Sequence, residues 1–130
     1  MRLSHGQTAV AAAAVIAAVA VAVPAFAGAG EQRQAAPKPK LVQVRDYYYA
    51  PEVVRVRKGG RVKWSWGAGP TDAHDVALYQ GPRGVRKGRF RSEVASAPFT
   101  FARTFRRPGR YRFWCSLHPT QMRMQVRVRR

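Results

Sequence analysis

The feature that most constrains the fold is a two-residue alternation of apolar with polar or basic side chains along short segments. It runs through residues 41–45, 54–57, 61–66, 99–105, 111–115 and 122–129. A period of two predicts strands with one buried and one solvated face. Gly and Pro separate these segments, and none shows the period of a helix. The chain is therefore predicted to be an all-β, Greek-key β-sandwich of about seven to eight strands.

The N-terminal segment has the composition of an export signal. Arg2 precedes an apolar run over residues 9–23, and Ala25-Phe26-Ala27 supplies the small residues of a cleavage site. The run has 15 residues, fewer than the roughly 20 that span a bilayer. We therefore expect cleavage after Ala27 and an exported protein that is periplasmic, extracellular or held in the cell envelope. Retention of the segment as an uncleaved anchor is the alternative.

The chain divides into three predicted regions. Residues 1–27 are the predicted secretory signal peptide. Residues 28–40 show no periodic apolar pattern and are predicted to be a flexible linker. Residues 41–130 carry all the predicted strands and suffice for one small domain with a single core.

The chain is strongly basic, with 24 Lys and Arg against 6 Asp and Glu and a formal net charge of +18. Such an excess would suggest nucleic acid as a partner in a cytosolic protein. Predicted export and the absence of a nucleic-acid motif argue against that partner. We expect attraction to an acidic protein or to anionic components of the cell envelope. An arginine-rich, solvated surface with no specific partner is the alternative.

The only cysteine stands in a cluster of residues that can bind a metal ion. Cys115, His118 and Met122 fall within eight residues, and His74 is the only other histidine outside the predicted signal. A lone exported cysteine is an inert buried residue, an intermolecular bridge or a metal ligand. Two imidazoles, one thiolate and a weak axial thioether are the ligands of blue-copper electron-transfer sites. The residues therefore predict a mononuclear copper site.

Two rival uses of these residues fit the sequence less well. A structural zinc site usually takes four Cys, His or carboxylate ligands, and the sequence offers only three candidates, His74, Cys115 and His118. A Cys–His nucleophile would need a separate acid or an oxyanion loop, and neither is recognisable. We therefore expect a metal-binding protein that is not an enzyme.

The order of these elements resembles the cupredoxin family, in particular plastocyanin, amicyanin and pseudoazurin. The resemblance covers residues 41–128 and rests on four motifs: Tyr49-x-Pro51, the segment 56–64 with its glycine turn and Trp64, His74-x-Val76, and Pro108-Gly109-x-Tyr111-x-Phe113-x-Cys115-x-x-His118-Pro119.

The resemblance implies a cupredoxin-like sandwich with one copper ion, bound by His74, Cys115 and His118 and by Met122 in the axial position. It implies a monomeric carrier that moves one electron at a time between Cu(I) and Cu(II). An acidic cytochrome or oxidase domain is the expected redox partner. Copper binding or delivery in extracytoplasmic copper homeostasis is the alternative function.

The axial position has two candidates, because Met122 and Met124 share the inward parity of the last predicted strand. Counted back from the closing Val126-x-Val128, the axial methionine of the family corresponds to Met122. Met124 is then expected to pack in the core. Three residues separate His118 from Met122, one more than in amicyanin-like loops and one fewer than in plastocyanin-like loops.

The sequence also allows predictions for two residues next to the ligands, Asp75 and Trp114. Asp75 stands where the family commonly has an asparagine that braces the ligand loops. Because an ionised carboxylate cannot donate a hydrogen bond, the brace at the thiolate must come from the backbone amide or from another residue. Trp114 has the opposite parity to Cys115 and is expected to face away from the metal. It serves there either as a route for electrons or as cover for the outer sheet face.

Overall fold

The computed structural model describes residues 14, 35–96 and 98–130 of the 130-residue chain. The predicted signal peptide, apart from Ala14, and residues 28–34 of the predicted linker lie outside the described residues. Across the described part of the chain, no helix is long and apolar enough to cross a membrane. The strands all belong to one compact unit, Gln34–Arg130.

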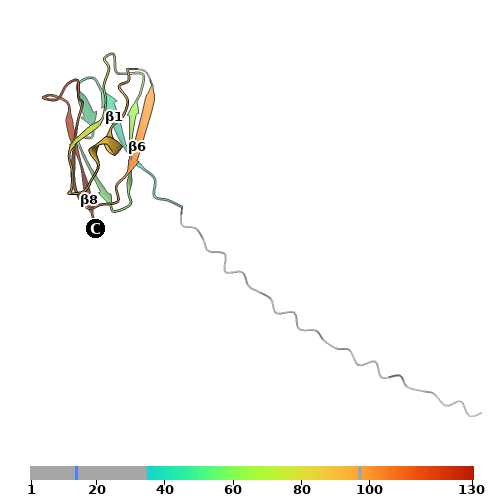
Figure 1. Cartoon of the computed structure of the whole chain (residues 1–130). Coiled ribbons are helices and arrows are strands. Elements are labelled where there is room, and N and C mark those ends of the chain that lie inside the picture. Colours follow the sequence, from blue (N-terminus) through green and yellow to red (C-terminus); the bar gives the residue numbers. More distant parts are fainter. Residues whose placement is uncertain (1–13, 15–34, 97) are drawn as a thin grey trace, which may run out of the picture. The chain divides into compact units, whose positions relative to one another are not determined.

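The unit is built from two four-stranded sheets (Figure 1). The first has the order β2-β1-β4-β6 and consists of β1 (Lys40–Arg45), β2 (Tyr48–Ala50), β4 (Arg61–Trp66) and β6 (Phe99–Thr104). The second has the order β3-β8-β7-β5 and consists of β3 (Val53–Arg57), β5 (Ala77–Gln80), β7 (Gly109–Trp114) and β8 (Arg123–Arg129). Both sheets are mixed, since β1 and β4 run parallel, as do β3 and β8. The predicted Greek-key β-sandwich of seven to eight strands is confirmed.

The alternating apolar side chains predicted from the sequence point into the core, and the polar side chains between them lie toward the surface. In β4, Val62, Trp64 and Trp66 are buried while the intervening side chains are partly exposed. The ring of Trp64 lies 5.2 Å from that of Phe113 on the opposing sheet, a separation at which aromatic pairs attract beyond their burial. Both tryptophans thus belong to the core.

The turn between β3 and β4 lies where the sequence predicts it, at Lys58-Gly59-Gly60. Gly59 adopts a φ of +85°, a left-handed conformation that glycine adopts without steric cost. The short strands β2 and β5 lie outside the segments predicted from alternation, and so does the 3-10 helix η1 (Lys87–Phe90). A helix of four residues is too short to produce a periodic pattern in the sequence.

The topology brings three separate segments to one end of the sandwich. β1 and β4 are parallel, so the β1–β2 turn lies at the same end as the segment that follows Trp66 and leads to His74. Phe113 pairs with Met124 and Trp114 with Arg123 in the β7–β8 hairpin, which places the connecting residues 115–122 at that hairpin's tip. The predicted ligands all come from these connections, so the fold rather than local sequence brings them together.

Candidate metal centre

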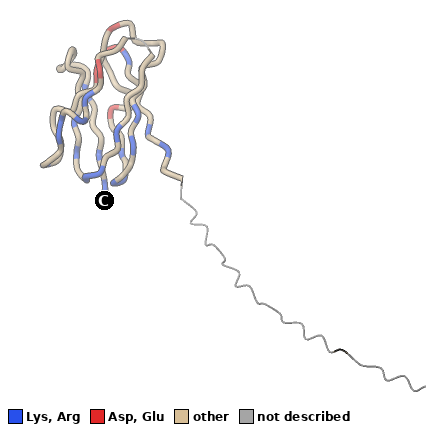
Figure 2. Tube along the Cα trace, turned by 45° about the vertical axis from the view of Figure 1, so that its right-hand side comes forward, with Lys and Arg blue, Asp and Glu red and all other residues tan. Residues whose placement is uncertain are grey.

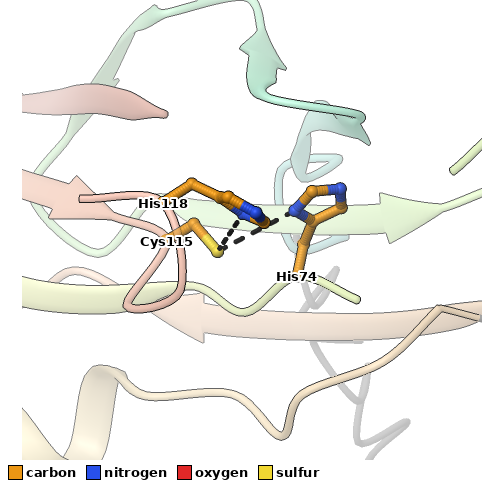
Figure 3. A group of neighbouring side chains, drawn as sticks. All are labelled: His74, Cys115 and His118. Atoms are coloured by element: carbon orange, nitrogen blue, oxygen red, sulfur yellow. Dashed lines mark hydrogen bonds between the residues drawn. The ribbon is translucent and has the colours of Figure 1, made fainter. Parts of the chain in front are cut away.

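Three predicted ligands converge in the structure, as Figure 3 shows. The Sγ atom of Cys115 lies 3.6 Å from Nδ1 of His118 and 3.9 Å from Nδ1 of His74. All three donor atoms lie within 4.8 Å of one another. Cys115 and His74 are fully buried, whereas His118 is partly exposed.

These separations fit a single copper ion. Ligand atoms bonded to one ion at about 2.0 to 2.3 Å in a trigonal plane are themselves about 3.5 to 4 Å apart. The distances from Cys115 to the two imidazoles fall in that range. Two imidazoles with one thiolate are also the strong ligands of a blue-copper site. Both the spacing and the chemistry of the donor set therefore suit copper.

The loop that carries two of these ligands is closed by its own backbone. The N–H of His118 donates to the carbonyl of Cys115 at 3.1 Å, and the N–H of Met122 donates to the carbonyl of His118 at 3.0 Å. The N–H of Cys115 donates to the carbonyl of Met122 at 3.0 Å, which extends the β7–β8 ladder by one residue pair. Residues paired across a ladder present their side chains on the same face. Met122, fully buried, therefore neighbours Cys115 on the inner face.

Met124 lies two residues further along the same face and has a different environment. Its sulfur accepts a hydrogen bond from Nε1 of Trp64 at 3.1 Å. Both side chains are buried in the core between the sheets. The expectation that Met124 packs in the core agrees with this contact.

His74 is held by groups on every side. Its Nε2 lies 2.9 Å from a carboxylate oxygen of Asp46, so this nitrogen carries the proton and Nδ1 is left to face Cys115. Its carbonyl accepts from Nε1 of Trp66 at 3.2 Å. Its backbone also exchanges two hydrogen bonds with Ala95, each of 3.0 Å. Buried and oriented in this way, the imidazole has little freedom to turn away from the site.

Asp46 joins the ligand to the neighbouring loop and was not identified from the sequence. Its carboxylate accepts from the backbone N–H of Thr71, from the Thr71 hydroxyl and from the backbone N–H of Asp72. The N–H of Thr71, the contact with His74 and the N–H of Asp72 together hold the pKa of Asp46 well below its usual range. The side chain thus remains an anion that positions the imidazole.

The second brace runs between Asp75 and the cysteine loop. The backbone N–H of Asp75 faces Sγ of Cys115 at 3.5 Å, which is the first of the two alternatives that the sequence left open for this brace. The buried carboxylate accepts from the N–H and from the hydroxyl of Ser116, both at 2.6 Å. Arg91 lies 3.5 Å from the same carboxylate. Two ligand segments, around residues 74 and 115, are therefore fastened directly to each other.

Burial alone would keep the metal-binding sulfur protonated. Desolvation raises the pKa of the Cys115 thiol, and the backbone N–H groups of Asp75, Leu117 and His118 oppose this rise only in part. Because the thiolate rather than the thiol binds metal, metal binding has to displace a proton from this sulfur.

Tyr47 covers the solvent side of the two imidazoles and was also missed in the sequence. Its ring centroid lies 5.0 Å from that of His118 and 5.9 Å from that of His74, nearly perpendicular to both. Its hydroxyl donates to the carboxylate of Asp72. The residue has a φ of +67°, which is uncommon for a side chain of this size. The two-residue alternation of side chains does not indicate a left-handed backbone conformation at this position.

Trp114 lies on the outer face of its sheet, as predicted. Its ring stacks on Tyr79 at 4.7 Å, and the guanidinium of Arg123 lies 5.7 Å from the Tyr79 centroid. The tryptophan is half-buried. Its place next to Cys115 in the sequence thus gives the centre an aromatic neighbour that reaches the surface.

Comparison with known proteins agrees with this geometry. The profile described as "Copper binding proteins, plastocyanin/azurin family" matches residues 40–129. Amicyanin from Paracoccus versutus is similar in structure, with 30% sequence identity and a TM-score of 0.59 over 69% of this chain and 80% of that one. The sequence finds no match among curated proteins.

Two other solved structures share the fold. A purple cupredoxin from Nitrosopumilus maritimus aligns at 21% identity and a TM-score of 0.57, covering 68% of this chain and 98% of that one. A copper-containing nitrite reductase from Thermus scotoductus aligns at 26% identity and a TM-score of 0.60. That alignment covers 72% of this chain but only 23% of the reductase.

Proposed function

The chain belongs to the plastocyanin/azurin family of copper-binding proteins, and we propose that it is an exported blue-copper protein that carries one electron at a time between redox partners. The observation that carries the proposal is the convergence of His74, Cys115 and His118 within 4.8 Å. Copper bound there supplies a one-electron couple, Cu(I)/Cu(II).

The proposed ligand set adds Met122 to these three residues. Met122 is the fully buried methionine whose backbone pairs with Cys115. The sulfur of the competing Met124 is already in contact with the Trp64 indole. A weak axial thioether fits a site in which three strong donors occupy one plane. Met122 is therefore the proposed axial ligand.

The burial of the site favours a carrier over an enzyme or a copper-delivery protein. Cys115 and His74 are inaccessible to solvent, and His118 is partly exposed. An electron can pass through a partly exposed imidazole, whereas a substrate would need direct access to the metal. Copper delivery, the alternative function, would need ligands that a receiving protein can reach. The similarity to nitrite reductase covers too little of that enzyme to suggest the same reaction.

Spectroscopy of the full chain loaded with Cu(II) tests this function. We expect intense visible absorption from thiolate-to-copper charge transfer, which a mild reductant bleaches and an oxidant restores. The Cys115→Ala variant should lose the absorption, because the chain contains no other thiol. A colourless wild-type protein with an ordinary tetragonal copper resonance would contradict the assignment.

The proposed redox partner is an acidic protein that docks on the basic outer face beside Trp114. Arg112 shares this face and contacts Gln80 through a 3.0 Å hydrogen bond. Because attraction between exposed charges is screened over about 8 Å at physiological ionic strength, electron exchange with an acidic cytochrome should slow steeply as salt rises. Combined Arg112→Glu and Trp114→Leu changes should slow exchange while leaving the copper spectrum intact. An unchanged rate would locate electron exit at His118 alone.

Export and domain boundaries complete the proposal. We propose that residues 1–27 are removed as a signal peptide, that residues 28–40 form a linker and that residues 41–130 form the copper-binding domain. The apolar run and its small-residue end support this division. Mass spectrometry of the protein recovered outside the cytoplasm should find Gly28 at the N-terminus. Recovery with Met1 intact would favour the uncleaved anchor.

A further inference from the structure

A second feature of the domain is a groove lined by arginines that includes none of the metal-centre residues. Five arginines line it: Arg86, Arg89, Arg103, Arg106 and Arg107. Phe90 and Tyr111, with ring centroids 5.5 Å apart, also line the groove, and no carboxylate does. The groove lies between η1 and the connection from β6 to β7. Figure 2 shows blue positions along the whole length of the domain, including the end where the chain terminates, with the red positions away from that end.

The positive charge of the groove is not neutralised by the described part of the chain. The close contacts between carboxylates and basic side chains found there join Asp46 to His74 and Asp75 to Arg91. Both belong to the metal end, so no carboxylate pairs with an arginine of the groove. Guanidinium groups gathered without counter-charges repel one another, and a bound anion would relieve that repulsion.

Two of the guanidinium groups are fixed in position before any ligand arrives. Arg103 donates from Nε to the carbonyl of Arg89 at 2.5 Å and from Nη1 to the carbonyl of Ala102 at 2.7 Å. Arg107 donates from Nη1 to the carbonyl of Arg83 at 3.1 Å. A Cβ at Gly84, whose φ is +79°, would lie 2.9 Å from that Nη1. The absence of a side chain at Gly84 leaves room for the Arg107 guanidinium, and the Arg83 carbonyl holds it. Because the group is already ordered, binding a ligand costs less conformational entropy.

The domain contains a second basic hollow that lacks this order. It is lined by residues at the β3–β4 turn and at the chain's end, among them Arg57, Arg61 and Arg129. These side chains make no hydrogen bond within the residues described here, unlike Arg103 and Arg107. Eight Lys and Arg residues line this hollow, against five in the groove. Because it has more positive charge without fixed geometry, it is a control for purely electrostatic attraction.

From the charge and the fixed geometry we infer that the arginine groove binds a multivalent phosphate anion. The planar fork of arginine matches phosphate oxygens in pairs, and five guanidiniums exceed what one phosphoryl group can engage. A chain of phosphoryl groups, or several phosphate headgroups of a lipid surface, offers that chemistry. The six residues of β7, about 20 Å of strand, separate Arg106 and Arg107 from Cys115. The site therefore goes beyond the proposed electron transfer and does not depend on it.

Titration calorimetry of the full chain with tripolyphosphate, at physiological salt, tests the inference. We expect saturable binding that the double variant Arg86→Gln/Arg106→Gln weakens by about tenfold or more. The matched variant Arg57→Gln/Arg61→Gln removes the same charge from the other hollow and should change the affinity by about twofold at most. The charge-retaining variant Arg103→Lys/Arg107→Lys should also weaken binding, because lysine cannot reproduce the fork. Circular dichroism checks that each variant is folded.

In a second experiment, phosphatidylglycerol vesicles replace tripolyphosphate. Co-sedimentation of each variant with the vesicles measures whether vesicle binding also depends on the groove arginines. Every variant retains residues 9–23, so differences between variants report the groove and not the apolar segment. Groove-dependent binding to tripolyphosphate supports a free polyphosphate as ligand. Groove-dependent binding to vesicles alone supports lipid headgroups. Equal losses in the groove and control variants, or no saturable binding to either probe, would overturn the inference.

Discussion

The two histidines of the metal centre are held in different ways. His74 is inaccessible to solvent and is fixed through its ring by Asp46, through its carbonyl by Trp66 and through its backbone by Ala95. His118 is partly exposed, and its ring lies close to Cys115, His74 and Tyr47.

This difference assigns a different role to each histidine of the site, one rigid and buried and the other partly exposed. The His74 side is fixed before metal arrives, because its hydrogen bonds come from strands and loops that the core holds in place. The His118 side lies on a loop that is closed by its own backbone and braced at Ser116 by Asp75, and its imidazole is partly exposed. A rigid inner ligand limits rearrangement between oxidation states, and a partly exposed outer ligand gives electrons a short way out. The predictions below test this division.

Removing each imidazole should give the largest contrast. His74→Gly should abolish the copper absorption, and added imidazole should fail to restore it, because the vacated space is closed to solvent. His118→Gly should also lose the absorption, but imidazole should enter from the surface and restore it. Visible absorption titrated with imidazole measures both. Equal rescue of the two variants would show that the burial of His74 does not limit access.

Loss of the carboxylate behind His74 should have the next largest effect. Asp46→Ala removes the group that fixes the imidazole, and metal affinity should fall by about 10- to 100-fold. Competition with a copper chelator measures the affinity. Asp72→Ala is the matched control, since its side chain contacts the Tyr47 hydroxyl and not a ligand. An affinity that falls equally in both variants would mean that the loop, rather than the Asp46 contact, orients His74.

Substitution of Met122 should change the reduction potential of the copper, whereas substitution of Met124 should change the stability of the fold. Met122→Leu should raise the reduction potential and keep the colour, because the oxidised state loses its weak axial donor. Met124→Leu should leave the potential unchanged and lower the free energy of unfolding by about 1–2 kcal/mol, because the buried Trp64 N–H loses its acceptor. Protein-film voltammetry and denaturant unfolding measure the two effects. The opposite pattern would make Met124 the axial ligand.

Much of this could be predicted from sequence, because the strands and ligands carry local signals. Alternation in residues 61–66 and 122–129 depends only on which face is buried, and the structure has β4 and β8 there. Cys115, His118 and His74 could be selected because the chain offers few other thiols or imidazoles. Both signals, the small number of possible ligands and the two-residue alternation, can be read without knowledge of the tertiary fold.

The supporting residues could not be predicted, because their roles depend on contacts between distant segments. Asp46 acts on His74, 28 residues away, only because parallel pairing of β1 with β4 brings the two connections to one end. Tyr47 covers the imidazoles through a left-handed backbone conformation that no sequence pattern indicated. The arginine groove likewise joins η1 to a connection more than ten residues later. In each case only the three-dimensional fold defines the neighbours.

The pH dependence of stability should show the smallest effect and tests whether Asp46 is an anion in the folded chain. Its pKa lies well below the ordinary value of 3.8, so its contribution to stability is complete above about pH 4 and is lost as the pH falls towards the folded-state value. Asp46→Asn has no such titration. The difference in melting temperature between metal-free wild type and Asp46→Asn should therefore be constant from about pH 6 to about pH 4 and should narrow gradually in stronger acid. Thermal unfolding followed by circular dichroism measures this difference. A gap that stays constant into stronger acid would show that the hydrogen bonds from Thr71, Asp72 and His74 do not favour the anion, because a group with the same pKa in the folded and unfolded states adds no pH dependence to stability. The difference in how the two histidines are held would then rest on Trp66 and Ala95 alone.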